Sequence, residues 1–304
     1  MSQLEKLTTE SRHPASERLD QMSAAELVAL MNGEDATVVE AVRAESIVIS
    51  QVVELVADRI RAGGRLVYLG CGTSGRLGVL DASECPPTFN TPPEMVVGII
   101  AGGDPALRRS SESTEDRPEE AVHDLQTHAL SAADVLIGIA SSGRTPYVLG
   151  GLEYARQIGA ATVGLTCNAG SDLATRADLV ICPVVGPEIL SGSTRMKAGT
   201  ATKMILNMIT TGTMVLLGKT YGNLMVDLRA TNSKLSDRAR RIVRDLTGLT
   251  AGNADALLRR CDGEVKTAIL AHQRGLAPDS ARQRLARCQG RLRAALELDT
   301  LSDT

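Results

Sequence analysis

LGCGTSGR, residues 69–76, is the stretch of this sequence that decides its fold. It follows a short apolar run, Arg65 to Leu69 (RLVYL), and leads directly into residues that favour a helix. A glycine-rich turn between a buried strand and a helix is typical of parallel α/β sheets. The free N–H groups and the dipole at the helix N-terminus attract an anion there. We therefore expect a parallel α/β sheet with an anion-binding turn.

The same turn also satisfies the GxGxxG pattern of dinucleotide-binding folds. Such folds place an acidic residue roughly 20 positions later, at the end of the second strand. Here the second predicted strand ends in Ala101-Gly102-Gly103-Asp104, more than 30 positions later. Thr73 and Ser74 instead offer hydroxyl groups that a phosphate or a sugar can use. The sequence favours a phosphorylated small molecule over a dinucleotide.

Four further apolar runs complete a predicted sheet of five strands. They are Met95 to Ala101, Val135 to Ala140, Ala161 to Thr166 and Leu179 to Val184. Their hydrophobicity is continuous rather than alternating, which indicates strands buried on both faces of a doubly wound parallel sheet. Crossover helices are expected at Arg76 to Ser83, Ala106 to Leu130, Pro146 to Ile158 and Leu173 to Arg176.

Composition and periodicity divide the chain into three parts. Residues 1–54 form an amino-terminal arm and most of a long helix, predicted from Thr37 to Arg61 and stopped by glycines. Residues 55–234 hold the sheet and a second long helix, predicted from Ser193 to Leu217. Residues 235–304 read as short helical segments rich in Arg, Ala and Leu and broken by glycines, which predicts a separate small helical domain.

The composition argues against several functional classes. The net charge is −3, no basic stripe is present, and the chain has no Trp and one Phe, so nucleic-acid binding has little support. No stretch reaches the roughly 18 apolar residues of a spanning helix, and the amino terminus lacks a signal-like apolar region. The six cysteines form no CxxC pair, and the four histidines show no metal-ligand spacing. We expect a cytoplasmic protein without metal, membrane or nucleic-acid partner.

A second hydroxyl-rich turn follows the third predicted strand. Ser141 to Pro146 reads SSGRTP, in which Pro146 suits the first helical position and Thr145 suits the cap. Either turn alone is explained as a capped connection between a strand and a helix. Two such turns at neighbouring strand ends favour a ligand, because open α/β sheets bind ligands beyond the carboxyl ends of strands where the strand order reverses.

Further polar and acidic residues are candidates for this site. The segment VGPEILSGSTRMKAGT (185–200) places Glu188 and Lys197 around a Ser/Thr cluster, although helix capping explains half of it. Glu84 precedes a double proline that we expect to end the first crossover helix, and Glu112 and Glu115 follow the second strand. A general acid or base needs a partly desolvated carboxyl group near the substrate, which sequence spacing cannot show.

Three segments identify a family. LGCGTSGRLGVLDASECPPTF (69–89), SSGRTPYVLGGLEYAR (141–156) and VGPEILSGSTRMKAGTATKMILNM (185–208) closely resemble the N-acetylmuramic acid 6-phosphate etherases. The resemblance starts at TESRHPASERLD (9–20), runs through YGNLMVDLRATNSKL (221–235) and extends more loosely into the tail. It implies a sugar isomerase (SIS) fold with a five-stranded parallel sheet, a small UBA-like carboxyl-terminal domain and pairing as a homodimer.

The resemblance also implies an activity. These etherases are lyases that release D-lactate from N-acetylmuramic acid 6-phosphate, giving N-acetylglucosamine 6-phosphate without a cofactor, in the recycling of peptidoglycan amino sugars. Glu84 matches the acid that protonates the departing lactate and then activates water. Glu115, the glutamate directly before Asp116, matches the second acidic residue and is taken as the base at C2. Which glutamate is base and which is acid stays open.

The implied pocket contains glycines, hydroxyls and charged residues. Ser74, Ser141, Ser142 and Thr145 are expected to hold the phosphate. Glu188, Ser193 and Lys197 complete the pocket, and Lys197 acts in its own subunit or in a partner. The full predicted binding set is Gly72, Thr73, Ser74, Gly75, Ser141, Ser142, Gly143, Arg144, Thr145, Glu188, Ser193 and Lys197.

Two alternatives remain at this stage. A non-catalytic sugar-phosphate sensor related to the glucokinase regulatory proteins shares these turns, but those regulators carry two tandem SIS domains, whereas this chain has one set of motifs. An aldose–ketose isomerase on the same fold normally brings a His for ring opening, and no His lies in a strand-end loop here. Local departures from the family pattern are His13, where many relatives carry Asn, and Cys71, where many carry Ala.

Overall fold

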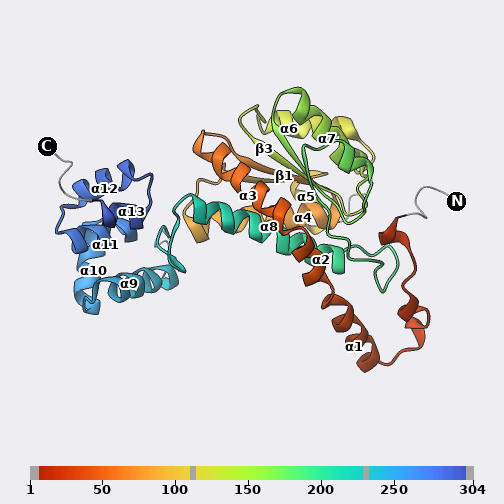
Figure 1. Cartoon of the computed structure of the whole chain (residues 1–304), viewed down its shortest axis with the longest axis horizontal. Helices are drawn as coiled ribbons and strands as arrows, with labels where there is room; N and C mark the ends of the chain where they lie inside the picture. The colour runs from red at the N-terminus through yellow and green to blue at the C-terminus, as the bar shows by residue number, and fades with distance from the viewer. Residues whose placement is uncertain (1–6, 110–113, 229–232, 299–304) are drawn as a thin grey trace. The chain divides into compact units, whose positions relative to one another are not determined.

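A computed structural model describes residues 7–109, 114–228 and 233–298 (Figure 1). The chain divides into two compact units. The first consists of Met1–Ser83 and Pro93–Thr210, and the second of Glu84–Pro92 and Thr211–Thr304. The predicted domain boundaries at residues 54 and 234 stay predictions.

The first unit is built on a parallel sheet of five strands. The strands are β1 (Leu66–Gly70), β2 (Val96–Ile100), β3 (Val135–Ile139), β4 (Ala161–Leu165) and β5 (Leu179–Ile181), in the order β2-β1-β3-β4-β5. Every residue of β1 and of β3 is buried, as their continuous hydrophobicity predicts. The predicted fold class is confirmed. Because Gly70 pairs with Ile139, the carboxyl ends of β1 and β3 lie level at one edge.

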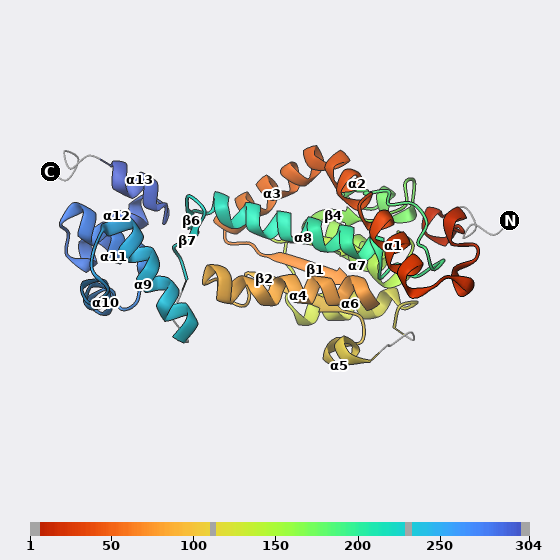
Figure 2. The same ribbon diagram turned by 90° about the horizontal axis from the view of Figure 1, so that it is seen from below.

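Helices cover both faces of this sheet. One face carries α6 (Pro118–Thr127) and α7 (Pro146–Gln157), whose Ala121, Leu125 and Leu152 are fully buried with strand residues. On the other face α4 (Gly72–Phe89) and α8 (Lys197–Leu216) run side by side (Figure 2). The other helices described in this unit are α1 (Ala24–Asp35), α2 (Val38–Ala44), α3 (Ser46–Arg61) and α5 (Gly103–Arg108). Short 3-10 turns lie at Thr8–Glu10, Pro14–Ser16, Leu19–Gln21 and Asp172–Thr175.

Two predicted helices prove to be interrupted. The helix expected from Thr37 to Arg61 is divided into α2 and α3 at Glu45, whose carboxylate accepts a hydrogen bond of 3.0 Å from the Cys182 N–H just after β5. A contact between residues so distant in sequence has no local signal. The helix expected from Ala106 to Leu130 is replaced by α5 and α6, and the loop between them includes residues 110–113, outside the described residues.

The first crossover helix is longer than expected. It starts at Gly72 rather than Arg76 and continues through Pro86 and Pro87 to Phe89, so the prediction that the double proline ends the helix is wrong. A proline removes one N–H donor, yet the Asn90 N–H still reaches the Pro86 carbonyl at 2.9 Å, and the helical path continues. Glu84 therefore lies within a helix.

Helix α4 packs closely along β1 and runs back from the carboxyl edge of the sheet. A Cβ at Gly75 would lie 2.5 Å from the Gly70 carbonyl oxygen, and a Cβ at Gly78 would lie 2.9 Å from the Tyr68 Cβ. These contacts explain why glycine occupies both positions. They also fix the direction of α4, since its successive turns meet successively earlier residues of β1.

A buried carboxyl group, Asp81, joins β1, α4 and α8. Tyr68 Oη donates to Asp81 Oδ2 at 2.9 Å, while Asn207 Nδ2 and Thr210 Oγ1 donate to Oδ1 at 2.6 Å and 3.2 Å. Burial raises the pKa of Asp81, and these three hydrogen bonds oppose the rise. The folded protein therefore holds a proton on Asp81 to higher pH than the unfolded chain does.

This pKa gives a stability prediction. The folded-state pKa of Asp81 lies above the ordinary value near 4. The contribution of Asp81 to the free energy of unfolding is therefore fully present below about pH 4 and is lost as the pH rises through the raised pKa. Asp81→Asn, which mimics the protonated group, is expected to lose this pH dependence. Urea unfolding between about pH 4 and 7 measures this effect. The free energy of unfolding of the variant, relative to that of the wild type, should increase as the pH rises. The same pH dependence of the free energy of unfolding in both proteins would contradict the raised pKa.

The second unit contains a helical region with its own core. It comprises α9 (Ser233–Thr247), α10 (Ala251–Arg260), α11 (Val265–Arg274), α12 (Pro278–Arg287) and α13 (Leu292–Glu297), preceded by the short strands β6 (Thr220–Tyr221) and β7 (Leu224–Met225). Val243, Ala254, Ile269 and Ala281 are fully buried in this core. None of the described helices of the chain is long and apolar enough to cross a membrane.

Candidate active site

The turn after β1 lies at the carboxyl edge of the sheet and opens α4. The Gly70 carbonyl accepts a hydrogen bond of 3.0 Å from the Ala101 N–H, which holds the end of β1 against the end of β2. Gly72 adopts a φ of +50°, a conformation that glycine tolerates without strain. Thr73 and Ser74 follow with partly exposed side chains at the N-terminus of an 18-residue helix. Free N–H groups and two hydroxyls therefore face the same edge.

The turn after β3 lies beside the first. Gly143 has a φ of +68°, and a Cβ there would lie 2.3 Å from Ser171 Oγ, so only glycine fits. The Arg144 N–H donates to Ser142 Oγ at 3.3 Å, and the Ser141 carbonyl accepts a bond of 2.8 Å from Asn168 Nδ2. Both serine side chains are half-buried. The turn is held by its backbone while its hydroxyls remain reachable.

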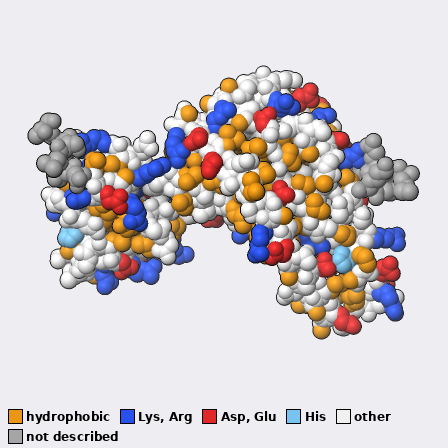
Figure 3. All heavy atoms as spheres, viewed as in Figure 1, with side chains coloured by type: hydrophobic (Ala, Val, Ile, Leu, Met, Phe, Trp, Pro, Cys, Tyr) orange, Lys and Arg blue, Asp and Glu red, His pale blue; other side chains and the backbone are white. Residues whose placement is uncertain are grey.

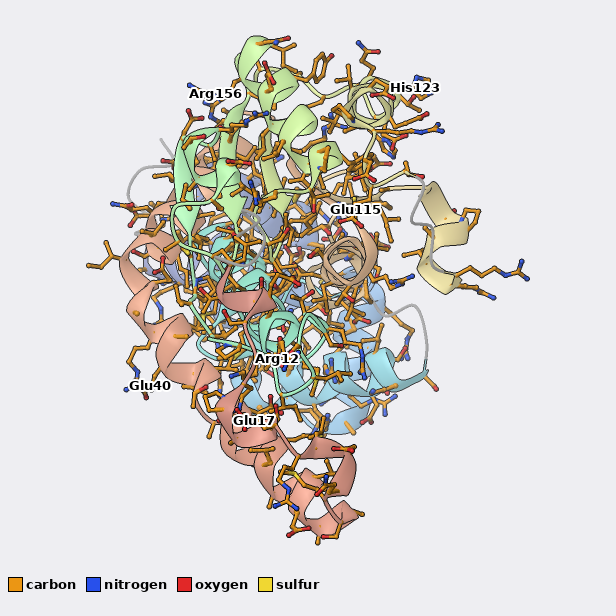
Figure 4. All side chains as sticks on the ribbon, turned by 90° about the vertical axis from the view of Figure 1, so that its right-hand side faces the viewer. Arg12, Glu17, Glu40, Glu115, His123 and Arg156 are labelled. Atoms are coloured by element: carbon orange, nitrogen blue, oxygen red, sulfur yellow. The ribbon has the colours of Figure 1, made fainter. Side chains whose placement is uncertain are left out.

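Glu115 joins this edge from the loop before α6 (Figure 4). Thr145 Oγ1 donates to Glu115 Oε1 at 3.1 Å, and the Tyr147 N–H donates to the Glu115 carbonyl at 3.0 Å. Burial raises the pKa of the Cys71 thiol, and the charges of Glu115 and Asp116 raise it further. Glu115 is thus close to both turns, exposed, and fixed by a residue of the second turn. Glu112 lies outside the described residues.

Glu188 is a buried residue that stabilises the start of a helix. Its side chain is fully buried, and its two carboxylate oxygens accept hydrogen bonds of 3.0 Å from the Lys197 and Ala198 N–H groups. It therefore caps the N-terminus of α8, where a negative charge is favourable. The same helix end approaches the first turn, because a Cβ at Gly199 would lie 3.7 Å from Thr73 Cγ2.

Removing this cap should destabilise the fold. Glu188→Ala leaves two buried N–H groups without an acceptor and is expected to lower the free energy of unfolding by about 2–4 kcal/mol. Urea unfolding measures the change. Glu17→Ala removes an exposed carboxylate and serves as the matched control, with an expected change within about 0.5 kcal/mol. Equal stability of the two variants would contradict the capping role.

Lys197 forms a buried ion pair with a residue of the same chain. Its side chain is 4% exposed, and Nζ lies 2.7 Å from Glu34 Oε2, which also lies 3.0 Å from His13 Nε2. The Lys197 and His13 contacts lower the pKa of Glu34, with the Lys197 hydrogen bond as the largest cause. Ser193 is half-buried in the loop before α8. Lys197 thus ties α1 to this loop.

Glu84 lies near the opposite end of α4 from the first turn. It follows Ser74 by ten residues, which at 1.5 Å per residue is about 15 Å along the helix axis. Its side chain is exposed. The structure brings Thr73, Ser74, Ser141, Ser142, Thr145 and Glu115 to one edge of the sheet, and Glu84 is not among them.

Sequence reasoning missed the contribution of the amino-terminal arm. Asn168 Nδ2 donates to Thr9 Oγ1 at 3.0 Å as well as to the Ser141 carbonyl, so the arm is anchored to the second turn. Glu34 was likewise missed. The segment TESRHP (9–14) carries part of the family resemblance, which is the one signal that marked the arm.

Comparisons with known proteins agree with this fold. The family model of the glucokinase regulatory protein N-terminal SIS domain matches residues 48–156, and that of the SIS domain matches residues 114–212. The structure of a phosphoheptose isomerase from Francisella tularensis superposes with a TM-score of 0.50 at 16% identity, covering 64% of this chain and 98% of that one. The class defined by the fold and the two turns is therefore the SIS-domain proteins.

Relatives with high sequence identity identify the family within this class. The chain is 58% identical to an N-acetylmuramic acid 6-phosphate etherase of Rhodopirellula baltica, over 96% of this chain and 97% of the relative. It is 52% identical to one of Clostridium beijerinckii, over 97% of each chain, and 53% identical to one of Yersinia pestis, over 95% of this chain and 98% of the relative. The chain belongs to the N-acetylmuramic acid 6-phosphate etherase family and is an enzyme.

Proposed function

We propose that this chain is a lyase that releases D-lactate from N-acetylmuramic acid 6-phosphate and yields N-acetylglucosamine 6-phosphate, in the recycling of cell-wall amino sugars. The observation that carries the proposal is Glu115 held at 3.1 Å by Thr145, beside two hydroxyl-rich turns at neighbouring strand ends. Membership of the etherase family adds the substrate. The proposal places the enzyme in the cytoplasm.

The two turns bind the phosphate in this proposal. The N-terminus of α4 offers backbone N–H groups and a positive dipole end, while Ser74, Ser141 and Ser142 offer hydroxyl donors. A phosphate anchored there leaves the sugar ring to extend across the sheet edge toward Glu115. The binding energy of the phosphate then serves to hold the reacting carbons near the carboxylate.

The chemistry requires only proton transfers. Ring opening exposes an aldehyde at C1, which acidifies the proton on C2. Glu115, as carboxylate, takes that proton, and the C3–O bond breaks so that lactate leaves with the ether oxygen and accepts a proton from Glu84. Water then adds to C3 of the unsaturated aldehyde, and C2 regains a proton. The sum is substrate plus water giving the two products, with each glutamate returned to its starting state.

Glu115 suits the role of base because the Thr145 hydroxyl positions its carboxylate and because the side chain stays exposed enough to meet a substrate. The sensor alternative is not favoured, because the relatives that match this chain over nearly its whole length carry the etherase name.

Isotope labelling tests the proposal. With N-acetylmuramic acid 6-phosphate in water enriched in oxygen-18, the label is expected at C3 of N-acetylglucosamine 6-phosphate and not in D-lactate, because the ether oxygen departs with lactate. Mass spectrometry of both products measures the outcome. Label in the lactate would indicate hydrolysis by attack on the lactyl carbon and would overturn the elimination route.

A further inference from the structure

The substrate of the proposed reaction carries two anionic groups, and the two turns account for only one of them. N-acetylmuramic acid 6-phosphate has a phosphate at C6 and a carboxylate on the lactyl ether at C3. The turns offer N–H groups and hydroxyls to the phosphate. A carboxylate that leaves water for a protein site needs donors of its own, and a guanidinium offers two parallel N–H groups to it. The site therefore calls for a cation that is free to bind this second anion.

Three cations around this edge already have partners within the chain. Lys197 is buried in its ion pair with Glu34. Arg144 Nε lies 3.5 Å from Asp172 Oδ2. The Arg76 guanidinium donates to two backbone carbonyls, at 2.7 Å and 3.1 Å. A substrate carboxylate could use any of the three only by competing with these contacts.

Arg12 is a cation of the same edge without such a contact. It belongs to the part of the amino-terminal arm before α1, residues 7–23. Its side chain is exposed, and among the described residues no carboxylate lies within ion-pair distance of it. Figure 3 shows basic and acidic side chains on the surface of this arm and of α1. Figure 4 looks onto the carboxyl edge of the sheet, and Arg12 and Glu115 both lie on the side that faces the viewer.

The backbone around Arg12 is fixed on both sides by buried polar contacts. Before it, Thr9 is fully buried, and its Oγ1 accepts a hydrogen bond of 3.0 Å from Asn168 Nδ2, which also bonds the second turn. After it, His13 is buried, and its Nε2 lies 3.0 Å from the carboxylate of Glu34 on α1. An anchored backbone with an unengaged guanidinium is a preorganised arrangement, because little backbone freedom remains to be lost on binding.

We propose that Arg12 binds the carboxylate of the lactyl group and thereby selects substrates that carry it. This inference rests on the proposed function. The guanidinium donates two hydrogen bonds to the carboxylate while the turns hold the phosphate, so the sugar is held at two points and C2 and C3 are positioned relative to Glu115. The product N-acetylglucosamine 6-phosphate lacks the carboxylate and keeps only the phosphate contacts, which favours its release.

A double-mutant cycle between Arg12 and the carboxylate tests this contact. The wild type and Arg12→Gln are assayed with N-acetylmuramic acid 6-phosphate and with its lactyl amide, in which the carboxylate is replaced by a neutral group. Either change alone is expected to lower kcat/KM by about 10–100-fold, the usual loss for a hydrogen bond to a charged group, and the two together to lower it little further. Inhibition by N-acetylglucosamine 6-phosphate should be equal in both proteins, because this product has no carboxylate.

Arg18→Gln is the matched control. Arg18 is an exposed arginine of the same arm, and its guanidinium bonds Gln21 at 2.6 Å and 2.9 Å. This variant should keep wild-type kinetics with both substrates, and urea unfolding should show both variants as stable as the wild type.

Two results would overturn the proposal. The first is additive losses in the cycle, or an Arg12→Gln variant as fast as the wild type. The second is coupling to the carboxylate that is absent in Arg12→Gln and present in Arg195→Gln, which removes the exposed arginine just before α8. A wild-type protein that releases no lactate would instead refute the proposed function, so the two failures are distinguishable.

Discussion

Glu115→Gln is expected to reduce the rate of D-lactate release by about 10²–10⁴, the usual contribution of a positioned general acid or base. Glutamine keeps the shape of the side chain and an oxygen that can still accept the Thr145 hydroxyl, but it cannot take a proton. The two turns proposed to bind the phosphate are untouched, so KM should change little while kcat falls. Steady-state kinetics with N-acetylmuramic acid 6-phosphate measures both.

Deuterium exchange identifies the step that this variant loses. If Glu115 is the base, the variant should fail to exchange the C2 proton of the substrate with solvent deuterium. Because the side chain is exposed, its urea unfolding curve should match that of the wild type. Full-rate lactate release, or undiminished C2 exchange, would remove Glu115 from the role of base.

Glu84→Gln is expected to lower the rate of lactate release by a similar factor, about 10²–10⁴, through a different step. The variant keeps Glu115, so the C2 proton should still exchange with solvent while lactate remains attached. The exposed position of Glu84 predicts an unchanged free energy of unfolding. Loss of C2 exchange along with lactate release would assign the role of base to Glu84 instead of Glu115, and wild-type kinetics would exclude Glu84 from the chemistry.

Much of the fold was predictable because its signals are local. Buried parallel strands read as continuous apolar runs. Four of the five strands lie within the predicted ranges, and β1 extends one residue beyond its range, to Gly70. The turns after β1 and β3 were recognisable from glycines and hydroxyls in short segments. The adjacency of these two strands, on which the shared site depends, is confirmed by the pairing of Gly70 with Ile139.

The errors arise from contacts between distant parts of the chain. Glu45, at the break between α2 and α3, accepts a hydrogen bond from the Cys182 N–H. The Ser141 carbonyl accepts one from Asn168, whose side chain also bonds Thr9, 159 residues away. No periodicity encodes such pairs. The double proline after Glu84 favoured a helix end, but the α4 backbone continues past it. That continuation places Glu84 within the helix and not at its end.

The release of D-lactate from N-acetylmuramic acid 6-phosphate by the purified full-length chain tests the account most directly. We expect D-lactate and N-acetylglucosamine 6-phosphate in equal amounts, at the same rate with and without EDTA, and a loss of about 10²–10⁴ in the Glu115→Gln variant assayed in parallel. Absence of lactate, release that stops on chelation, or a Glu115→Gln variant as fast as the wild type would contradict it.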